Sequence, residues 1–299
     1  MKQIWLLVGL LIFYFFINPV THVSAHNGTV EHSTVIDLIG HWNLILAGVL
    51  VFVLVMYILQ FKKEQDFRKK FSYFFLALLV FYLALGSPLH VLGDHYLFSA
   101  HMLEQSLIYI VLPPLLLLSL PNRFAEPIFR LGLKVKIIRF LKKPLIPLLL
   151  FNVLFSFYHI PQIFNEVVSN NILHNLAHIT LTVTALFMWI PLIPVIEELN
   201  RLSEVQKIGY IFGAGILLTP ACALIIFSNE PFYTVYAGTP ELLDLLPPID
   251  DQQTGGIIMK VIQELVFGTM IGYLFFKWAR KERLKDDFPD KSVSGGVNQ

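Results

Sequence analysis

The chain has 299 residues, of which 56% are hydrophobic and only 14% are charged, and its mean hydropathy is +0.66. Soluble domains carry about 25% charged residues, so this composition excludes an ordinary soluble protein and predicts an all-α, polytopic membrane protein. The net charge of +1 gives no reason to expect a nucleic-acid partner. The single cysteine, Cys222, excludes an intrachain disulfide and a CxxC redox motif.

The first apolar stretch, residues 4–20, has the layout of a secretory signal peptide. Lys2 gives a short basic start, the apolar run follows, and Val23-Ser24-Ala25 supplies the small residues typical of a cleavage site. The sequence therefore predicts a signal peptide over 1–25 that is cleaved after Ala25. An uncleaved first helix is the alternative.

Seven further stretches are long and apolar enough to cross a bilayer, which takes about 20 mostly apolar residues in a helix. We expect them to form a seven-helix transmembrane bundle over residues 26–280. The polar end of the chain, 281–299, is expected to be a disordered cytoplasmic tail. The stretches lie at about 38–60, 71–92, 99–121, 144–160, 172–196, 208–228 and 256–277.

The basic residues predict how the chain is oriented in the membrane. Of the 22 lysines and arginines, 20 fall at the C-terminus or in alternate connections between the stretches, and such residues mark the cytoplasmic side. The opposite loops carry acids such as Asp94 and Glu166 but no lysine or arginine. We therefore expect a multi-pass protein of the cell membrane with a cytoplasmic C-terminus and, after cleavage, an extracytoplasmic N-terminus.

Nine of the ten histidines lie on or near the predicted extracytoplasmic face, and none lies on the cytoplasmic side. Ionisable side chains in membrane segments are costly, so a functional role is the first hypothesis. His174 and His178 are four residues apart and share one helix face. Imidazole suits copper, zinc, iron and nickel, whereas a thioether selects cuprous copper. Histidines with methionines, and no cysteine ligand, therefore point to copper.

The candidate metal ligands are the histidines and methionines near this face, with Glu104 placed to orient a ligand histidine. The plainer alternative, that an outer histidine is an interfacial anchor or a helix cap, is favoured for His22, His32 and His41. The candidate ligands are His101, His174, His178, His159, Met102, His95, His90 and Met259.

Several short motifs follow one another along the mature chain. They are Ser99-Ala100-His101-Met102 running into Leu112–Pro121, His159-Ile160-Pro161, His174-x-x-x-His178 with Trp189-Ile190-Pro191, and Asp251-Gln252-x-x-Gly255-Gly256-x-x-Met259. In this order, over roughly residues 38–280, they resemble the CtaG family of cytochrome c oxidase assembly factors.

The resemblance implies a seven-helix membrane protein that is required to form a haem-copper oxidase of the caa type and is thought to bring copper to it. Its partners would be cytochrome c oxidase subunits and membrane lipid. The metal-handling role would fall on His101, His159, His174 and His178.

Two positions depart from the family's pattern. Gln105 stands where many relatives have a second histidine, one turn after the His-Met pair, and Lys260 stands where an aromatic residue is commoner. Lys260 is four residues before Glu264, and we expect the two to pair, which lowers the cost of both charges in lipid.

The sequence as a whole favours an assembly factor, and not an enzyme, that binds copper and delivers it at the extracytoplasmic side. A single HxxxH pair is too few for a histidine-box hydroxylase, and no HExxH motif of a zinc protease is present. Two alternatives stay open. A copper or cation transporter would need polar residues deeper in several helices, and a metal-free scaffold for oxidase assembly would need no ligands.

Overall fold

The computed structural model of the protein describes residues 42–121, 123, 126, 127, 129–131, 142–237 and 246–287. All regular elements within these residues are helices, which confirms the predicted all-α class. The expected signal peptide, 1–25, lies outside the described residues, as do His22, His26, His32 and His41.

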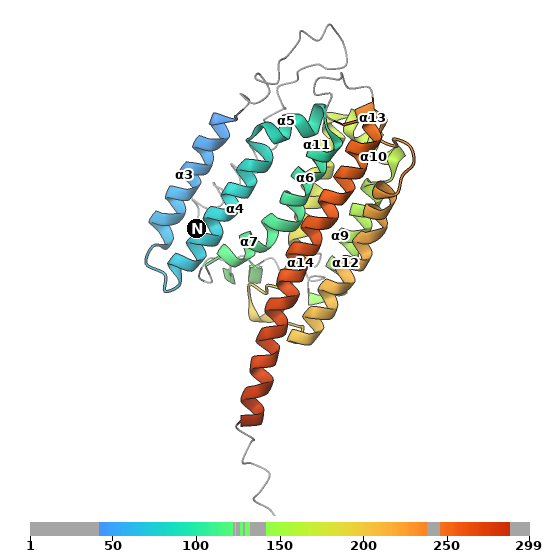
Figure 1. Cartoon of the computed structure of the whole chain (residues 1–299). Helices are drawn as coiled ribbons and strands as arrows, with labels where there is room; N and C mark the ends of the chain where they lie inside the picture. Colours follow the sequence, from blue (N-terminus) through green and yellow to red (C-terminus); the bar gives the residue numbers. More distant parts are fainter. Residues whose placement is uncertain are drawn as a thin grey trace, which may run out of the picture.

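The helices lie side by side in a bundle, and the longer ones run along a common direction (Figure 1). One π-helical segment, η1 (Leu107–Val111), lies in the middle of the long apolar helix from Phe98 to Ser119. In chain order the elements are α3 (Leu44–Phe61), α4 (Phe67–Leu85), α5 (Pro88–His95), α6 (Phe98–Ser106), η1 (Leu107–Val111), α7 (Leu112–Ser119), α9 (Leu145–Tyr158), α10 (Pro161–Ser169), α11 (Asn171–Trp189), the 3-10 turn η3 (Glu197–Leu199), α12 (Glu204–Ile226), α13 (Thr234–Ala237) and α14 (Pro248–Asp287).

Five of these helices are long and apolar enough to cross a membrane: α3, the continuous α6–η1–α7 helix, α11, α12 and α14. Two bent pairs, α4 with α5 and α9 with α10, pass the same test together, with bends of 44° and 80°. By length and composition, the described residues therefore hold five candidate spans, or seven when each bent pair counts as one. Large apolar side chains such as Leu44 and Phe276 are exposed, as expected of helices that face lipid.

The bend between α4 and α5 divides the predicted stretch 71–92 into two helices. Pro88 has no N–H to donate to the preceding turn, so it ends one helix and is well suited to begin the next. The hydroxyl of Ser87 caps α5 by accepting a hydrogen bond from the Leu89 N–H at 3.2 Å. Pro161 opens α10 in the same way after α9.

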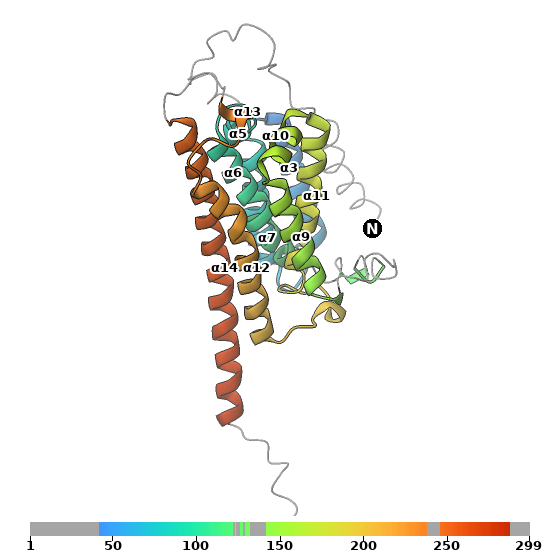
Figure 2. The ribbon, with the colours of Figure 1, turned by 90° about the vertical axis from the view of Figure 1, so that its right-hand side faces the viewer.

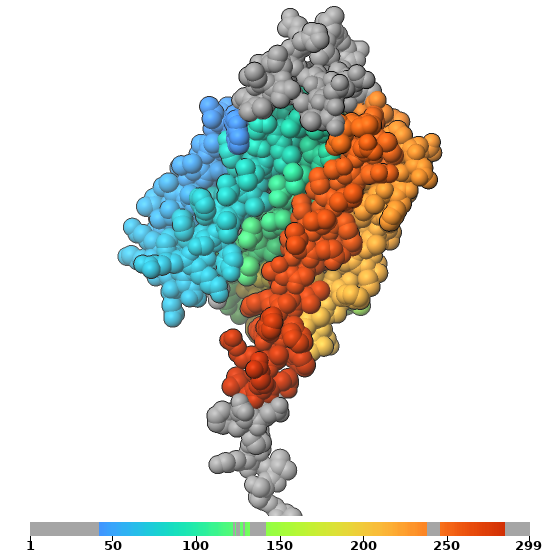
Figure 3. All heavy atoms as spheres, in the orientation of Figure 1, coloured from blue at the N-terminus to red at the C-terminus, as the bar shows by residue number. Residues whose placement is uncertain are grey.

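Helix α14 forms one outer face of the bundle and continues past its end (Figures 1 and 3). It begins at Pro248, before the predicted stretch 256–277, so the Asp251-Gln252 motif is helical. At the other end it runs through residues 281–287 of the expected disordered tail. Residues 288–299 lie outside the described part of the chain.

The α6–η1–α7 helix is the centre of the bundle. In the 18-residue apolar window of this helix, 67% is buried inside the protein, against 22–39% in the corresponding windows of the other four single spans. Helix α3 lies at the edge, where the Tyr57 hydroxyl donates a hydrogen bond to the Ser119 carbonyl at 2.8 Å. A side chain that projects inward from α6 is therefore surrounded by protein and not by lipid.

The short helices α5, α10 and α13 gather at one end of the bundle, where α6, α11 and α14 begin (Figure 2). The lysine-rich turn between α3 and α4 lies at the opposite end (Figure 1). The fold thus closes one end of the bundle with short helices, and the histidines of the described residues lie at that end.

Candidate metal centre

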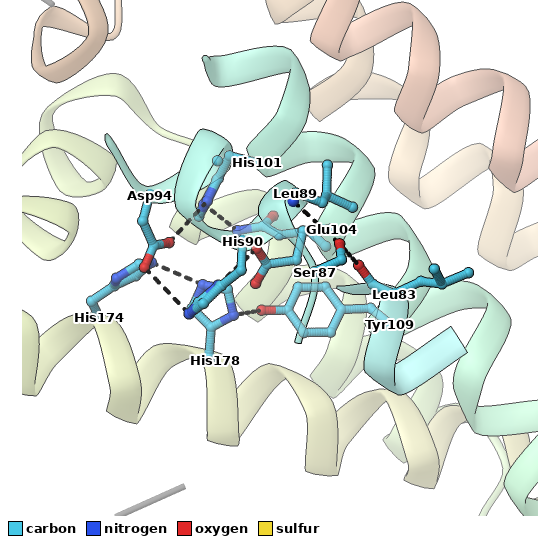
Figure 4. Close-up of polar contacts among 12 residues, drawn as sticks. Leu83, Ser87, Leu89, His90, Asp94, His101, Glu104, Tyr109, His174 and His178 are labelled. Carbon is cyan, nitrogen blue, oxygen red and sulfur yellow. Dashed lines mark hydrogen bonds and ion pairs between the residues drawn. The ribbon is translucent and has the colours of Figure 1, made fainter. Parts of the chain in front are cut away.

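Three histidines from two helices form the centre of the polar cluster (Figure 4). His101 comes from the first turn of α6, and His174 and His178 come from the first two turns of α11. One ring nitrogen from each lies within 4.8 Å of the others. The Nε2 atoms of His174 and His178 are 2.9 Å apart. His101 is fully buried, whereas His174 is partly exposed.

The N-terminus of α11 fixes the position of the His174 and His178 rings. The Asn170 side chain accepts hydrogen bonds from the N–H groups of Ile172 and Leu173 and caps α11. His174 and His178 then fall on one face because they are four residues apart. The expectation that this pair shares a helix face is therefore confirmed.

Helix α6 is capped from another helix. Its N-cap residue, Leu97, has no side chain that can cap. Instead the Asp251 carboxylate of α14 accepts hydrogen bonds from the N–H groups of Phe98 and Ser99, at 2.7 and 3.1 Å. A carboxylate at a helix N-terminus also interacts favourably with the helix dipole. Asp251 thus holds the turn of α6 that carries His101.

A second group adjoins the three histidines. It consists of His90 and Asp94 from α5 and Glu104 from α6, and one ligand atom of each lies within 4.8 Å of the others. Nδ1 of His90 is 3.0 Å from Oε2 of Glu104, and its Nε2 is 3.7 Å from Oδ2 of Asp94. The other oxygen of Asp94 is 4.0 Å from Nδ1 of His101.

A glycine allows the two groups to meet. A Cβ atom on Gly93 would lie 3.0 Å from both Cα and N of His101, which is tighter than nine in ten real Cβ contacts. Glycine at this position therefore lets α5 approach the backbone of α6 directly. Asp94, the next residue, is thereby brought beside His101.

The π-helical segment brings a tyrosine to the histidines. Pro113 and Pro114 cannot donate the hydrogen bonds that would continue an α-helix through the preceding turn, and the chain there forms i→i+5 bonds, as from the Leu112 N–H to the Leu107 carbonyl. The buried Tyr109 lies in this segment, and its hydroxyl is 2.9 Å from Nδ1 of His178.

Three imidazole nitrogens form a donor set of the kind that suits zinc, copper, iron and nickel ions. Nδ1 of His178 is hydrogen-bonded to the Tyr109 hydroxyl, so Nε2 of His178 faces His174. Nδ1 of His101 is buried and has no hydrogen-bond partner, nor has Oε1 of Gln105. Nε2 of His101 lies 2.8 Å from the Gln105 amide nitrogen. A half-turn of this amide would place Oε1 there instead, where it would accept a hydrogen bond from Nε2–H of His101. Nδ1 of His101 would then be free to bind a metal. Histidine ligands of metals almost always donate their second N–H in this way.

The remaining predicted ligands are His159, His95, Met102 and Met259, and neither group of histidines and acids among the described residues includes the two histidines. His159 is fully buried, with Nδ1 2.8 Å from the Phe155 carbonyl oxygen and no partner at Nε2. His95 is the last residue of α5. Met102 and Met259 are buried in the core where α6 meets α14. Their role as ligands stays a prediction.

The sequence alone did not single out Asp94 or Tyr109 as site residues. Asp94 could have been found from its spacing, because it follows His90 by four residues and so shares its helix face. Tyr109 lies within an apolar run and carries no such signal. The predicted pair of Lys260 and Glu264 is confirmed, with Nζ and Oε1 2.6 Å apart.

Comparison with known proteins connects this geometry with a family. No curated protein and no solved structure matches the chain. The model of the cytochrome c oxidase caa3 assembly factor family, Caa3_CtaG, matches residues 62–281. This range covers well over half of the chain and includes both side-chain groups and the Asp251 cap. The chain therefore belongs to the cytochrome c oxidase caa3 assembly factor family.

Proposed function

We propose that this protein binds copper with His101, His174 and His178 and passes it to a haem-copper oxidase during assembly, at the extracytoplasmic side of the cell membrane. Membership of an oxidase assembly family supports a non-catalytic role. The observation that carries the copper assignment is the convergence of three imidazoles from α6 and α11, two of them buried. Imidazole nitrogen is a good ligand for copper.

Transfer requires that the ion leave by exchange of ligands, and the three histidines differ in a way that suits this. His101 and His178 are buried, whereas His174 is partly exposed at the end of the bundle. A partner's ligand would replace His174 first, while the two buried imidazoles still hold the ion. Three protein ligands also leave a coordination position for an incoming group, as at catalytic metal sites.

The test is the metal content of the detergent-purified protein after loading with cuprous copper and washing. We expect wild type to retain one copper per chain and the His101→Ala/His174→Ala/His178→Ala variant to retain none. Asn175→Ala is the matched control, because this residue lies on α11 between the two histidines and belongs to neither group. Thermal unfolding would establish that all three proteins are folded.

A metal-free scaffold is the competing function, and one observation favours it. The contacts of His178 with His174 and Tyr109 form a hydrogen-bonded core that requires no ion. Oxidase activity in cells carrying His174→Ala/His178→Ala separates the two functions. Loss of activity, with normal amounts of the variant in the membrane, would support copper delivery. Unchanged activity would support the scaffold.

A further inference from the structure

The group of His90, Asp94 and Glu104 lies beside the three histidines but is built from different residues. We propose that it is a second metal site, for a divalent transition-metal ion, and that Asp94 lies between the two ions. The protein would then hold two ions next to each other at the closed end of the bundle. This goes beyond the proposed copper site, because it assigns a separate ligand set and a different class of ion.

The burial of the carboxylates is the first argument. Glu104 is 1% exposed, and its Oε1 has no hydrogen-bond partner. The Asp94 side chain is 9% exposed, and its Oδ1 also has no hydrogen-bond partner. Buried ionised carboxylates without compensation are strongly unfavourable, so such groups are normally paired or bind metals. The carboxylate of Glu104 points to His90 at 3.0 Å, into the group and not toward solvent.

Charge is the second argument. Among the described residues, the ion-pair partners of Asp94 and Glu104 are histidines, and no lysine or arginine reaches either carboxylate. A histidine offers positive charge only when it is protonated. A bound divalent ion would supply charge to both carboxylates and use the oxygens that lack hydrogen-bond partners.

The ligand types define the class of ion. One imidazole and two carboxylates form a harder set than three imidazoles, and such mixed sets suit zinc, ferrous, manganous or cupric ions more than cuprous copper. Asp94 faces both groups, with Oδ2 3.7 Å from Nε2 of His90 and Oδ1 4.0 Å from Nδ1 of His101. It is therefore in place to bridge two ions.

Cupric ion is a suitable probe, because its electron paramagnetic resonance reports both number and proximity. The detergent-purified protein is loaded with cupric ion, passed through a desalting column, and measured for copper content and spectrum. We expect two coppers per wild-type chain, with a spectrum broadened by spin–spin coupling. Glu104→Gln should retain one copper with an uncoupled spectrum. His174→Ala/His178→Ala should also retain one, held by the second group.

Glu166→Gln is the matched control, because Glu166 is an exposed acid on α10 at the same end of the bundle. It should bind two coupled coppers. Asp94→Asn preserves side-chain volume and is the second variant if Glu104→Gln does not fold. It should lose one copper and the coupling.

The outcomes separate this proposal from the function proposed above. A single copper that survives Glu104→Gln and is lost from the histidine variant would overturn the second site and leave the copper site standing. A single copper that is lost from Glu104→Gln but retained by the histidine variant would support the second site and contradict the proposed copper site. One copper lost from both variants would mean that the two groups form a single site, which also overturns the proposal.

Discussion

The ring nitrogens of the clustered histidines have different partners, and these partners decide which nitrogen is left to bind a metal. Tyr109 occupies Nδ1 of His178, and Tyr158 and Gln105 lie at Nε2 of His101. Such outer partners fix the tautomer and orientation of a ligand imidazole. The copper hypothesis therefore makes a prediction about a residue that does not itself bind copper.

Tyr109→Phe removes the hydroxyl that holds His178 and preserves the ring. We expect the affinity for cuprous copper to fall by about 10- to 100-fold, the usual effect of losing the outer partner of a ligand histidine. Competition with a chromophoric cuprous chelator would measure it.

Tyr57→Phe is the control for Tyr109→Phe, because it also removes a buried tyrosine hydrogen bond, to the Ser119 carbonyl, but on α3. Both variants should lose about 1 kcal/mol of stability. Equal copper affinities in the two variants would contradict a positioning role for Tyr109.

At the scale of helices, the site depends on how closely α5, α6 and α14 approach one another. The Asp251-Gln252-x-x-Gly255-Gly256 motif explains much of this. Asp251 caps α6, and Oε1 of Gln252 accepts hydrogen bonds from the N–H groups of Phe232 and Tyr233. A Cβ atom on Gly255 would lie 2.7 Å from the Phe98 ring. The motif therefore holds the first turn of α6 and does not supply the clustered ligands.

Asp251→Ala leaves the first N–H groups of α6 without their acceptor. We expect a loss of about 1–3 kcal/mol of stability, because a buried, charge-assisted helix cap is removed. Copper retention should also fall, since His101 lies in the turn that loses its cap. Thermal unfolding in detergent would measure stability. The neighbouring Asp250→Ala is the control, because Asp250 is exposed; if it had the same effect, the capping explanation would fail.

Gly93→Ala tests the approach of α5 to α6. The new methyl group would meet the backbone of His101 at 3.0 Å, and a backbone cannot move aside as a side chain can. We expect about 1–3 kcal/mol of destabilisation and weaker binding of metal by both groups.

Gly213→Ala is the control for Gly93→Ala, because a Cβ atom at this position of α12 meets nothing within 4 Å. It should be neutral or slightly stabilising, since alanine favours a helix over glycine. Thermal unfolding and copper retention of both variants would be measured side by side. Full metal binding by Gly93→Ala would show that close packing of α5 on α6 does not shape the site.

At the scale of the whole molecule, the two ends of the bundle differ in chemistry. One end carries the short helices and the histidine clusters, and the other carries basic turns such as the one between α3 and α4. The positive-inside rule predicts that the basic end faces the cytoplasm. Under the copper hypothesis, the ion would then reach the oxidase from the extracytoplasmic side.

Labelling of single cysteines tests this orientation. Glu166→Cys and Lys63→Cys place one thiol at each end, in a Cys222→Ala background that removes the buried native cysteine. We expect a membrane-impermeant maleimide to label only Glu166→Cys in intact cells and both variants after permeabilisation. Labelling of only Lys63→Cys in intact cells would reverse the predicted topology.

The sequence by itself determined the long helices, most of their ends, and the contacts made along a single helix. The His174 and His178 pair and the Lys260–Glu264 ion pair are four residues apart, and the geometry of the α-helix alone brings such residues together. Apolar length predicted the spans. Pro88 divided a predicted helix because proline's local effect on the backbone outweighed the continuous hydropathy of the stretch.

Only the tertiary structure decided which helices meet at the site. The contact of Asp251 with Phe98 joins residues 153 apart in the chain, and that of Tyr109 with His178 joins residues 69 apart. A helix that is apolar on all sides has no hydrophobic stripe to fix its rotation. In lipid, helix contacts depend instead on close packing and on hydrogen bonds between helices. Those contacts, at Gly93, Gly255, Asp251 and Tyr109, placed His101 beside His174 and His178.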